Sequence, residues 1–334
     1  MKRSKVAILG GGSWGTTTAS VISRHCDAIL WARDGQIVDE INQAHTNHRY
    51  LGDAALNAKL AATTDIGAAV NQAEAVLIAV PSSHFREVLA SALSDLPMGI
   101  PLISLSKGLE KGSRMRMTEI IHDVAPGRIA GVLTGPNLAR EIVAGQAAAS
   151  VLALEDHEAA LALQPKLNAG LFRVYTNQDV IGCELGGVLK NIIAIAVGMG
   201  DGLGAGDNTR AALITRGLAE MSRLGEALGG KAETFAGLAG MGDMIATCTS
   251  PQSRNRHVGM ELAKGRSIDD IIDTMHMVAE GVKSAPTVID LAQEKGISLP
   301  ISEDVYRVII GESSARGVYR GLLRVTAGAE SDPG

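Results

Sequence analysis

Cysteine and aromatic residues are scarce in this chain of 334 residues. There are three cysteines, and aromatic residues make up 3% of the composition. An odd number of cysteines with no CxxC pair excludes a disulfide framework and predicts reduced thiols in a cytoplasmic protein. The histidines are isolated as well: His45 and His48 have an i, i+3 spacing, but no cluster nearby completes a ligand set. We therefore predict no metal site.

Long apolar runs and a large net charge are also absent. The apolar run VAIL near the N-terminus is too short for a signal peptide, and glycines follow it directly. No stretch approaches the roughly 20 apolar residues of a membrane span, and the apolar helix around Lys190 is expected to be too short. A net charge of −5 gives no indication of binding to nucleic acid or an anionic membrane. We predict a protein that neither binds nucleic acid nor inserts into a membrane.

The chain does contain many glycines, and three of them near the N-terminus have the spacing of a nucleotide-binding loop. Residues 5–10, KVAILG, are typical of a buried strand, and the helical segment TTTASVISRH follows the loop GGGSWG. Gly10, Gly12 and Gly15 fit the pattern G-x-G-x-x-G, whose glycines let the backbone turn tightly and approach a pyrophosphate at a helix N-terminus. A plain turn also uses glycines. The strand before the loop, the helix after it and a second strand at the expected distance favour a dinucleotide.

The residues at the end of that second strand, DAILWAR, indicate whether the dinucleotide is NADH or NADPH. An acidic residue there would accept hydrogen bonds from a ribose 2′-hydroxyl, whereas an arginine suits a 2′-phosphate by charge and geometry. This chain has Arg33 first and Asp34 after it. The alternative is that Arg33 is a solvated loop charge. We predict a preference for NADPH over NADH.

Further apolar runs typical of strands follow along the chain, and segments typical of helices lie between most of them. Such alternation predicts an α/β fold with a Rossmann-type, doubly wound sheet, in which ligands bind beyond the carboxyl ends of the strands. Three loops fall there: one begins at Pro81, one carries Lys107, and one carries Gly135, Asn137 and Ala139. Lys107 by itself would be a surface lysine, and its place after a central strand makes it a candidate. The expected strands are 5–10, 27–33, 74–80, 100–105, 128–135, 147–154 and 171–176.

The strand pattern stops after about residue 180. Apolar positions at helical spacing then predict an all-α C-terminal domain. We assign residues 1–180 to a dinucleotide-binding domain, residues 181–326 to a helical substrate and catalytic domain, and residues 327–334 to a disordered tail. The expected helices are 181–200, 207–228, 232–248, 252–264, 268–275, 281–295 and 302–311.

The first of these helices, with the sequence GGVLKNIIAIAVGMG, carries Lys190 among apolar residues. A lysine in such a helix commonly extends its ammonium to solvent or forms a structural ion pair. Helical side chains lean toward the N-terminus, where the positions beneath Lys190 are Gly186 and Gly187, and neither can crowd the ammonium. We therefore expect an open patch where a lysine can act as a proton donor to a ligand.

A glycine-rich segment of the helical domain, TFAGLAGMGDMIATCTSPQSRNRHVG, carries further polar groups. Asp243 follows two glycines in the segment GLAGMGDM, and Ser253, Arg254 and Asn255 begin a helix after Pro251. A helix start with these three side chains suits a phosphate group. An ordinary capped helix would present the same residues, so both interpretations remain open at this point. No nucleophile elbow is present, and Cys248 is interpreted as a buried small residue.

Several longer motifs of the sequence, taken together, are similar to those of a known family. The block LKNIIAIAVGMGDGLGAGDNTRAALITRGLAEM is the most specific, and GGGSWGT, AVPSSHFR, SLSKGLE, GPNLAREI, TFAGLAGMGDM, SPQSRNRHVG and VAEGV accompany it in order, from residue 10 to about 283. In these motifs the sequence resembles the bacterial NAD(P)H-dependent glycerol-3-phosphate dehydrogenases. The resemblance implies an oxidoreductase that reversibly reduces dihydroxyacetone phosphate to sn-glycerol 3-phosphate with NADPH or NADH.

The resemblance also implies roles for individual residues. Lys190 would be the catalytic proton donor and acceptor. The substrate would be bound by Lys107, Gly135, Asn137, Lys190, Asp243, Ser253, Arg254 and Asn255. The cofactor would be bound by Gly10, Gly12, Ser13, Trp14, Gly15, Arg33, Lys107, Ala139, Arg254, Val278 and Glu280.

Some positions depart from the family pattern. Asn137 stands where many members have Ser or Thr, although an asparagine can still form hydrogen bonds there. Met244 replaces a common leucine in a swap that nearly conserves volume. The pattern fades after Tyr50, so the segment 48–50 receives no role.

The implied context is a cytoplasmic homodimer whose product feeds glycerophospholipid synthesis. Two other functions compete with this interpretation. A related dehydrogenase of β-hydroxyacids also uses a lysine in a helical domain, but its carboxylate site should lack the Ser-Arg-Asn helix start found here. A non-catalytic NADPH-binding sensor would need neither Lys190 nor Asp243.

Overall fold

The computed structural model describes residues 4–275 and 279–322 and divides the chain into two compact units. Unit 1 comprises Met1–Val180 and unit 2 comprises Ile181–Gly334. Val278 and the tail 327–334 lie outside the described residues.

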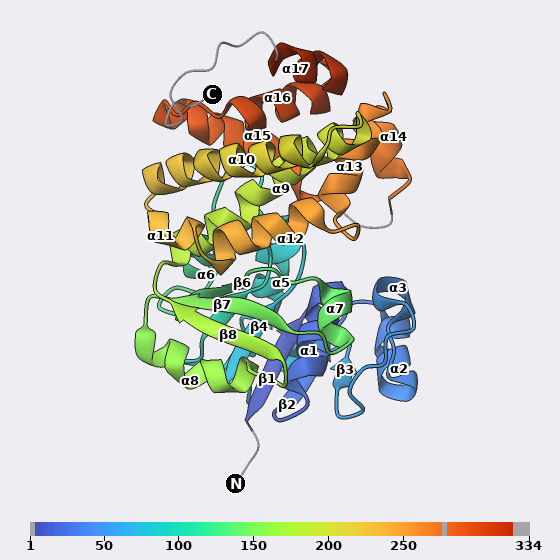
Figure 1. Cartoon of the computed structure of the whole chain (residues 1–334). Helices are drawn as coiled ribbons and strands as arrows, with labels where there is room; N and C mark the ends of the chain where they lie inside the picture. The colour runs from blue at the N-terminus through green and yellow to red at the C-terminus, as the bar shows by residue number, and fades with distance from the viewer. Residues whose placement is uncertain (1–3, 276–278, 323–334) are drawn as a thin grey trace. The chain divides into compact units, whose positions relative to one another are not determined.

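Unit 1 is built on one eight-stranded sheet with the order β3-β2-β1-β4-β5-β6-β7-β8 (Figure 1). All neighbouring strands pair in parallel except β6 and β7, which are antiparallel. The first six strands have the order of a Rossmann sheet, which confirms the predicted fold class. The strands are β1 (Lys5–Leu9), β2 (Asp27–Trp31), β3 (Ala61–Thr63), β4 (Ala75–Ile78), β5 (Leu102–Ser104), β6 (Ala130–Thr134), β7 (Ala148–Leu154) and β8 (Phe172–Asn177).

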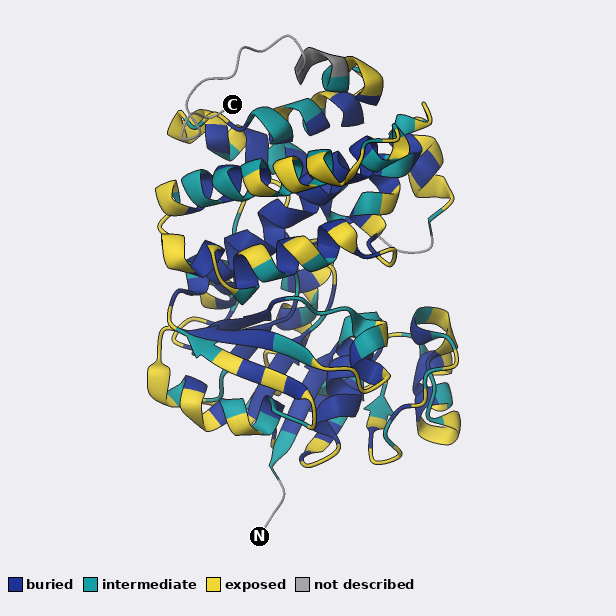
Figure 2. Ribbon diagram, in the orientation of Figure 1, coloured by how far each residue is buried: buried dark blue, intermediate teal, exposed yellow. Residues whose placement is uncertain are grey.

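Helices cover both faces of this sheet because its central strands are apolar on both sides. Val6 and Ile8 of β1 belong to one core cluster, and the alternate residues Ala7 and Leu9 belong to another. Figure 2 shows the same strands as continuously buried. The helices are α1 (Ser13–Ile22), α2 (Gly35–Ala44), α3 (His48–Leu51), α4 (Ile66–Val70), the 3₁₀ turn η1 (Ser82–His84), α5 (Phe85–Ala92), α6 (Met117–Val124), α7 (Ala139–Val143) and α8 (His157–Leu167).

Unit 2 is helical throughout its described residues. Its elements are α9 (Val180–Gly202), α10 (Asp207–Ala227), α11 (Ala232–Phe235), the π-helical turn η2 (Leu238–Gly242), α12 (Asp243–Thr249), α13 (Arg254–Ala263), α14 (Ile268–Asp273), α15 (Glu280–Lys295), α16 (Pro300–Ile309) and α17 (Ala315–Leu322). The expected single helix over 232–248 is wrong. Glycines at 237, 240 and 242 are poor helix formers, and the chain bends through η2 before α12 begins.

Helix α9 is the central apolar element of unit 2. It has 23 residues, so the expectation that it is too short for a membrane span is also wrong. By length and composition it could cross a membrane, but 94% of its most apolar window is buried inside the protein. Close packing explains this burial: a Cβ atom on Gly198 would lie 2.0 Å from the carbonyl oxygen of Arg256, and one on Gly259 would lie 2.1 Å from that of Ile195. The backbones of α9 and α13 therefore meet without side chains between them.

A buried carboxylate on α10 holds the start of α16. The side chain of Glu220 accepts hydrogen bonds from the backbone N–H of Ile301 (2.5 Å), the backbone N–H of Ser302 (3.1 Å) and the hydroxyl of Ser302 (2.8 Å). These donors would otherwise be unsatisfied at the helix N-terminus. Burial raises the pKa of Glu220, and the hydrogen bonds oppose that shift.

We predict that Glu220→Gln destabilises the protein by about 1–3 kcal/mol, because an amide NH₂ group would face backbone donors that have no other acceptor. The urea transition followed by circular dichroism measures this. Glu226→Gln, an exposed change on the same helix, is the control and should leave the transition in place. Equal midpoints for the two variants would refute the capping role of Glu220.

Candidate functional site

The glycine-rich loop of unit 1 joins β1 to α1 and is shaped by two close contacts. Gly10 has φ +128°, a conformation that favours glycine, and a Cβ atom on Gly15 would lie 2.0 Å from the carbonyl oxygen of Gly10. Gly12 differs, because no heavy atom lies within 4 Å of the place its Cβ would occupy. Packing thus requires glycine at the first and third positions, whereas the middle position leaves open space for a ligand.

The start of α1 offers polar groups beside this loop. Gly12 precedes the helix, and no side chain caps its N-terminus. The Nε1 atom of Trp14 is buried and has no hydrogen-bond partner among residues 4–275 and 279–322. Ser13 begins the helix and is partly exposed. An uncapped helix N-terminus with a spare N–H donor fits the pyrophosphate of a dinucleotide.

Arg33 and Asp34 follow β2, and their side chains differ in the contacts they make with the rest of the protein. Arg33 is exposed. The Asp34 carboxylate caps α2 by accepting from the N–H of Gln36 (3.0 Å), and it faces the guanidinium of Arg49 at 3.3 Å. The acidic side chain at this strand end is therefore occupied by protein groups, while the basic one reaches solvent.

Four predicted residues lie in the loops that follow the carboxyl ends of β5 and β6. The ammonium of Lys107 donates to the carbonyl oxygen of Gly135 (3.1 Å), and Ala139 begins α7 after the same loop. The hydroxyl of Ser150 donates to Oδ1 of Asn137 (2.5 Å). This bond fixes the amide, whose Nδ2 is buried with no partner among the described residues. Ser150, which lies on β7, was not predicted, because its pairing with Asn137 depends on the antiparallel β6–β7 ladder.

An ion pair anchors the loop that carries Lys107. Arg86 of α5 donates to both carboxylate oxygens of Glu110, at 2.8 and 2.9 Å. These bonds hold the pKa of Glu110 below its ordinary value. Arg86 lies in the motif PSSHFR, so that motif supports the Lys107 loop.

In unit 2, a buried lysine is bonded to two partners. The Nζ atom of Lys190 lies 2.5 Å from Oδ1 of Asp243 and 2.6 Å from the hydroxyl of Thr247. That hydroxyl donates in turn to the backbone carbonyl oxygen of Asp243 (2.6 Å). Lys190 is 5% exposed and Asp243 is 2% exposed. We refer to Lys190, Asp243 and Thr247 as the lysine centre.

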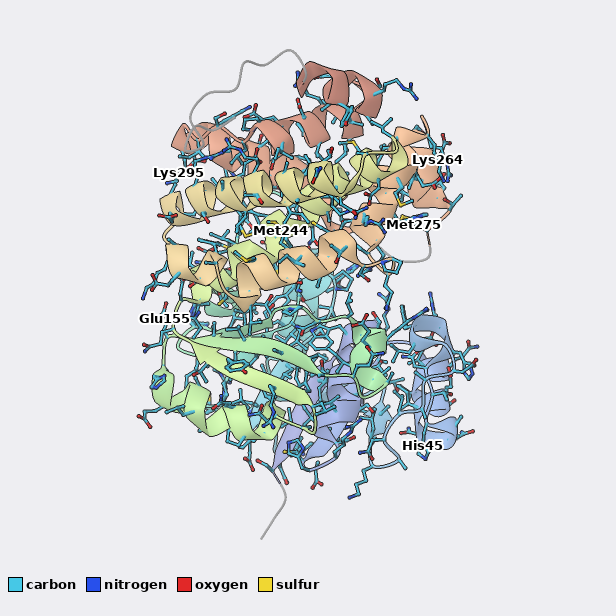
Figure 3. All side chains as sticks on the ribbon, viewed as in Figure 1. His45, Glu155, Met244, Lys264, Met275 and Lys295 are labelled. Atoms are coloured by element: carbon cyan, nitrogen blue, oxygen red, sulfur yellow. The ribbon has the colours of Figure 1, made fainter. Side chains whose placement is uncertain are left out.

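The local fold explains how these groups meet. Asp243 is the first residue of α12, directly after the π-helical turn, and Thr247 follows one helical turn later on the same face. Figure 3 labels their neighbour Met244 on this helix. The expected open patch at Gly186 is wrong, because a Cβ atom there would lie 2.6 Å from the carbonyl oxygen of Ala239. The glycine admits the backbone of η2, which leads directly into Asp243.

Thr247 was missed from the sequence, although the i, i+4 spacing from Asp243 carried the signal. Asn191 was missed as a partner of Asn255. The Nδ2 atom of Asn255 donates to Oδ1 of Asn191 (2.8 Å), and its Oδ1 accepts from the N–H of Gly281 (3.0 Å). Asn255 thus links α9, α13 and the first turn of α15.

The other predicted residues of α13 and α15 lie around this link. Ser253 caps α13 by accepting from the N–H of Arg256 (3.3 Å). Arg254 is exposed and interacts electrostatically with Glu280. The ordinary helix cap is thus present in this segment, and the phosphate site at the same residues stays a prediction.

Two other chemistries receive no support from the described part of the chain. Residues 4–275 and 279–322 contain no group of three or more His, Cys, Asp or Glu side chains that could hold a metal ion. Cys248 is buried on α12, and its burial, together with the nearby Asp243, raises the pKa of its thiol to about 12. Such a thiol stays protonated at neutral pH and is a poor nucleophile.

A sheet of Rossmann order with a glycine-rich loop after its first strand is typical of dinucleotide-dependent oxidoreductases. Residues 5–160 match the family described as NAD-dependent glycerol-3-phosphate dehydrogenase N-terminus, and residues 179–320 match the family described as its C-terminus. The chain therefore belongs to the NAD-dependent glycerol-3-phosphate dehydrogenase family.

Individual members of the family are similar to this protein over nearly the whole chain. A glycerol-3-phosphate dehydrogenase [NAD(P)+] of Sphingopyxis alaskensis is 62% identical over 99% of this chain and 100% of its own length. One from Mycobacterium tuberculosis is 51% identical over 98% of this chain and 97% of its own. The crystal structure of glycerol-3-phosphate dehydrogenase from Coxiella burnetii superposes with a TM-score of 0.91 at 37% identity, over 97% of this chain and 99% of that chain.

The ion pair that anchors the Lys107 loop predicts a pH dependence. The pKa of Glu110 is lower in the folded protein than its unfolded value of about 4.3. Its contribution to stability is therefore present above about pH 4.3 and is lost as the pH falls through the folded pKa. We expect the free-energy difference between the wild type and Glu110→Gln to shrink between pH 7 and pH 3.

Denaturant unfolding at several pH values measures this difference. Glu155→Gln, an exposed position labelled in Figure 3, serves as the control and should show no such trend. A difference for Glu110→Gln that stays constant down to pH 3 would contradict the assignment.

Proposed function

We propose that this protein reversibly reduces dihydroxyacetone phosphate to sn-glycerol 3-phosphate with NADPH or NADH. The observation that carries the proposal is the buried lysine centre, in which the ammonium of Lys190 is bonded to Asp243 and Thr247. Membership of the family supports the substrate and cofactor.

The residues present in unit 1 fit a dinucleotide. Gly10, Gly12 and Gly15 would surround its pyrophosphate, and Ser13 and Trp14 would contact it from the start of α1. When bound, the nicotinamide ring supplies the hydride. The remaining residues proposed to bind the cofactor are Arg33, Lys107, Ala139, Arg254, Val278 and Glu280.

The lysine centre would carry the proton chemistry. As hydride reaches C2 of dihydroxyacetone phosphate, negative charge grows on the carbonyl oxygen. The ammonium of Lys190 would stabilise this charge and donate a proton to the oxygen, which leaves a neutral amine. In the reverse reaction that neutral amine would accept the hydroxyl proton of sn-glycerol 3-phosphate. Asp243 favours the charged form of the lysine and fixes its direction.

Substrate binding would place the carbonyl carbon for attack. We assign the phosphate to Arg254, Asn255 and Ser253, so that binding energy far from the reacting carbon orients it. Lys107, Gly135 and Asn137 would contribute from unit 1, with the unpaired amide hydrogens of Asn137 as donors. Asn255 would act with an amide already fixed by Asn191.

The setting of the reaction is part of the proposal. We infer a cytoplasmic homodimer that is not inserted in a membrane, whose product serves glycerophospholipid synthesis. The absence of a large net charge and the reduced state predicted for the three cysteines support this setting.

The reaction itself predicts a simple assay. Purified protein with NADPH and dihydroxyacetone phosphate should lose absorbance at the reduced-nicotinamide band, and omission of either compound should abolish the loss. A β-hydroxyacid with oxidised cofactor is the comparison and should give no reaction. Folded protein that binds NADPH but does not turn over dihydroxyacetone phosphate with either cofactor would overturn the proposal.

The cofactor preference is tested at Arg33. We expect Arg33→Asp to lower the ratio of kcat/KM for NADPH to that for NADH about tenfold or more, because a charge-assisted contact to the 2′-phosphate is lost. Arg24→Asp introduces the same charge change at another exposed site of unit 1 and should keep the ratio. An unchanged ratio for Arg33→Asp would show that Arg33 is only a solvated charge.

A further inference from the structure

Asn47 is a buried polar residue that the assignments above leave without a role. It lies between α2 and α3, and it is 0% exposed. Its Nδ2 atom donates to the carbonyl oxygen of Gly11 (3.0 Å) and to the hydroxyl oxygen of Thr16 (2.9 Å). One amide group therefore contacts both the glycine-rich loop and the first turns of α1.

The bond to Gly11 has a consequence for the next peptide N–H. The described chain contains no cis peptide bond, and in a trans peptide the carbonyl and the following N–H point in opposite directions. Asn47 holds the carbonyl of Gly11, so the N–H of Gly12 is directed away from Asn47. Gly12 is also the residue whose missing Cβ leaves open space.

Hydrogen bonds also hold the residues on either side of Asn47 and its own backbone. The Glu40 carboxylate accepts from the hydroxyl of Thr46 (2.8 Å), from the backbone N–H of His48 (2.8 Å) and from the ring of His48. The backbone carbonyl of Asn47 accepts from the N–H of Leu51 (2.8 Å). The residues on both sides of Asn47 are therefore tied to α2 and α3.

The orientation of the amide follows from its partners. The carbonyl oxygen of Gly11 can only accept a hydrogen bond, so the NH₂ edge of Asn47 must face it. The Oδ1 atom is buried without a hydrogen-bond partner among the described residues. Only an asparagine-like NH₂ group serves both oxygens at this position, and an aspartate would face the carbonyl of Gly11 with a carboxylate.

We propose that Asn47 is a positioning residue for the dinucleotide: it fixes the Gly11–Gly12 peptide so that the N–H of Gly12 is presented to the pyrophosphate. This inference rests on the proposed function, because it requires a bound dinucleotide. Asn47 acts through Gly11 and Thr16 and has no direct contact with the ligand.

Equilibrium binding of NADPH to the full chain tests the role without any turnover. Asn47→Ala removes both donated hydrogen bonds, and we expect the Kd for NADPH, measured by its fluorescence on binding, to rise about tenfold or more. In the steady state, KM for NADPH should rise while kcat at saturating NADPH stays within about twofold, because the hydride-transfer geometry is assembled by other residues. Asn47→Asp keeps the size of the side chain and should weaken binding as well, and it decides the matter if the alanine variant does not fold.

Asn42, an exposed asparagine of α2, provides a control in the same unit. Its side chain also makes two hydrogen bonds, donating to the carbonyl of Ala62 (3.0 Å) and accepting from the N–H of Ala62 (2.8 Å), but it does not contact the glycine-rich loop. Asn42→Ala should lower the melting temperature and leave the Kd for NADPH unchanged.

The possible outcomes separate the two proposals. Wild-type protein that does not bind NADPH would refute the proposed function. Wild-type protein that binds NADPH, together with a folded Asn47 variant of unchanged Kd, would refute only the positioning role. A loss of affinity in Asn42→Ala equal to that in Asn47→Ala would also refute it, since the effect would then be a general loss of stability.

Discussion

The buried contact between Lys190 and Asp243 is the constraint on which unit 2 depends. Removing two charges from water is expensive, and the cost is recovered only when geometry and hydrogen bonding are both good. Here the ammonium lies 2.5 Å from the carboxylate, and the hydroxyl of Thr247 adds a second acceptor. The glycine at 186 and the π-helical turn are needed because they let the backbone of η2 approach α9 closely. The placement of the proposed catalytic lysine and the close packing of these helices are thus one structural requirement.

In unit 1 the groups that must be held accurately are backbone groups, whereas in unit 2 they are side chains. The groups proposed to face the dinucleotide are peptide N–H groups and a helix N-terminus, so the proposed binding depends on how accurately one loop is held. Contacts at Gly10 and Gly15 fix the loop from the sheet, and Asn47 fixes it from the segment between α2 and α3. In both units, a small residue admits a neighbouring backbone and a buried polar side chain sets the final orientation.

Much of this arrangement was predictable from the sequence because its signals are local. Apolar runs located seven of the eight strands. Strand β3 was missed because its sequence, Ala-Ala-Thr, is partly exposed and contains no run of large apolar side chains, whereas the equally short β5 is fully buried. The glycine spacing predicted the tight turn between β1 and α1, and the isolated lysine in an apolar helix drew attention to Lys190, which the structure shows to be buried. The family resemblance added Asp243, Asn137 and the Ser-Arg-Asn segment, whose neighbours the structure then supplied.

The features that escaped prediction depend on contacts between distant segments. Ser150 meets Asn137 only because β7 runs antiparallel to β6. Asn47 meets Gly11 across 36 residues, and nothing in its own neighbourhood indicates that contact. The break of the helix expected over 232–248 required weighing its glycines as backbone contacts, and not only as weak helix formers.

A single-turnover measurement on Lys190→Met tests the central claim most directly. Enzyme in excess and preloaded with NADPH would be mixed with dihydroxyacetone phosphate, and oxidation of the cofactor followed. If Lys190 is the proton donor, the Kd for NADPH should be unchanged and the rate of oxidation should fall by about 10²–10⁴-fold, the usual contribution of a positioned proton donor. A folded variant that oxidises NADPH at nearly the wild-type rate would show that the lysine centre stabilises the helices and does not carry the chemistry.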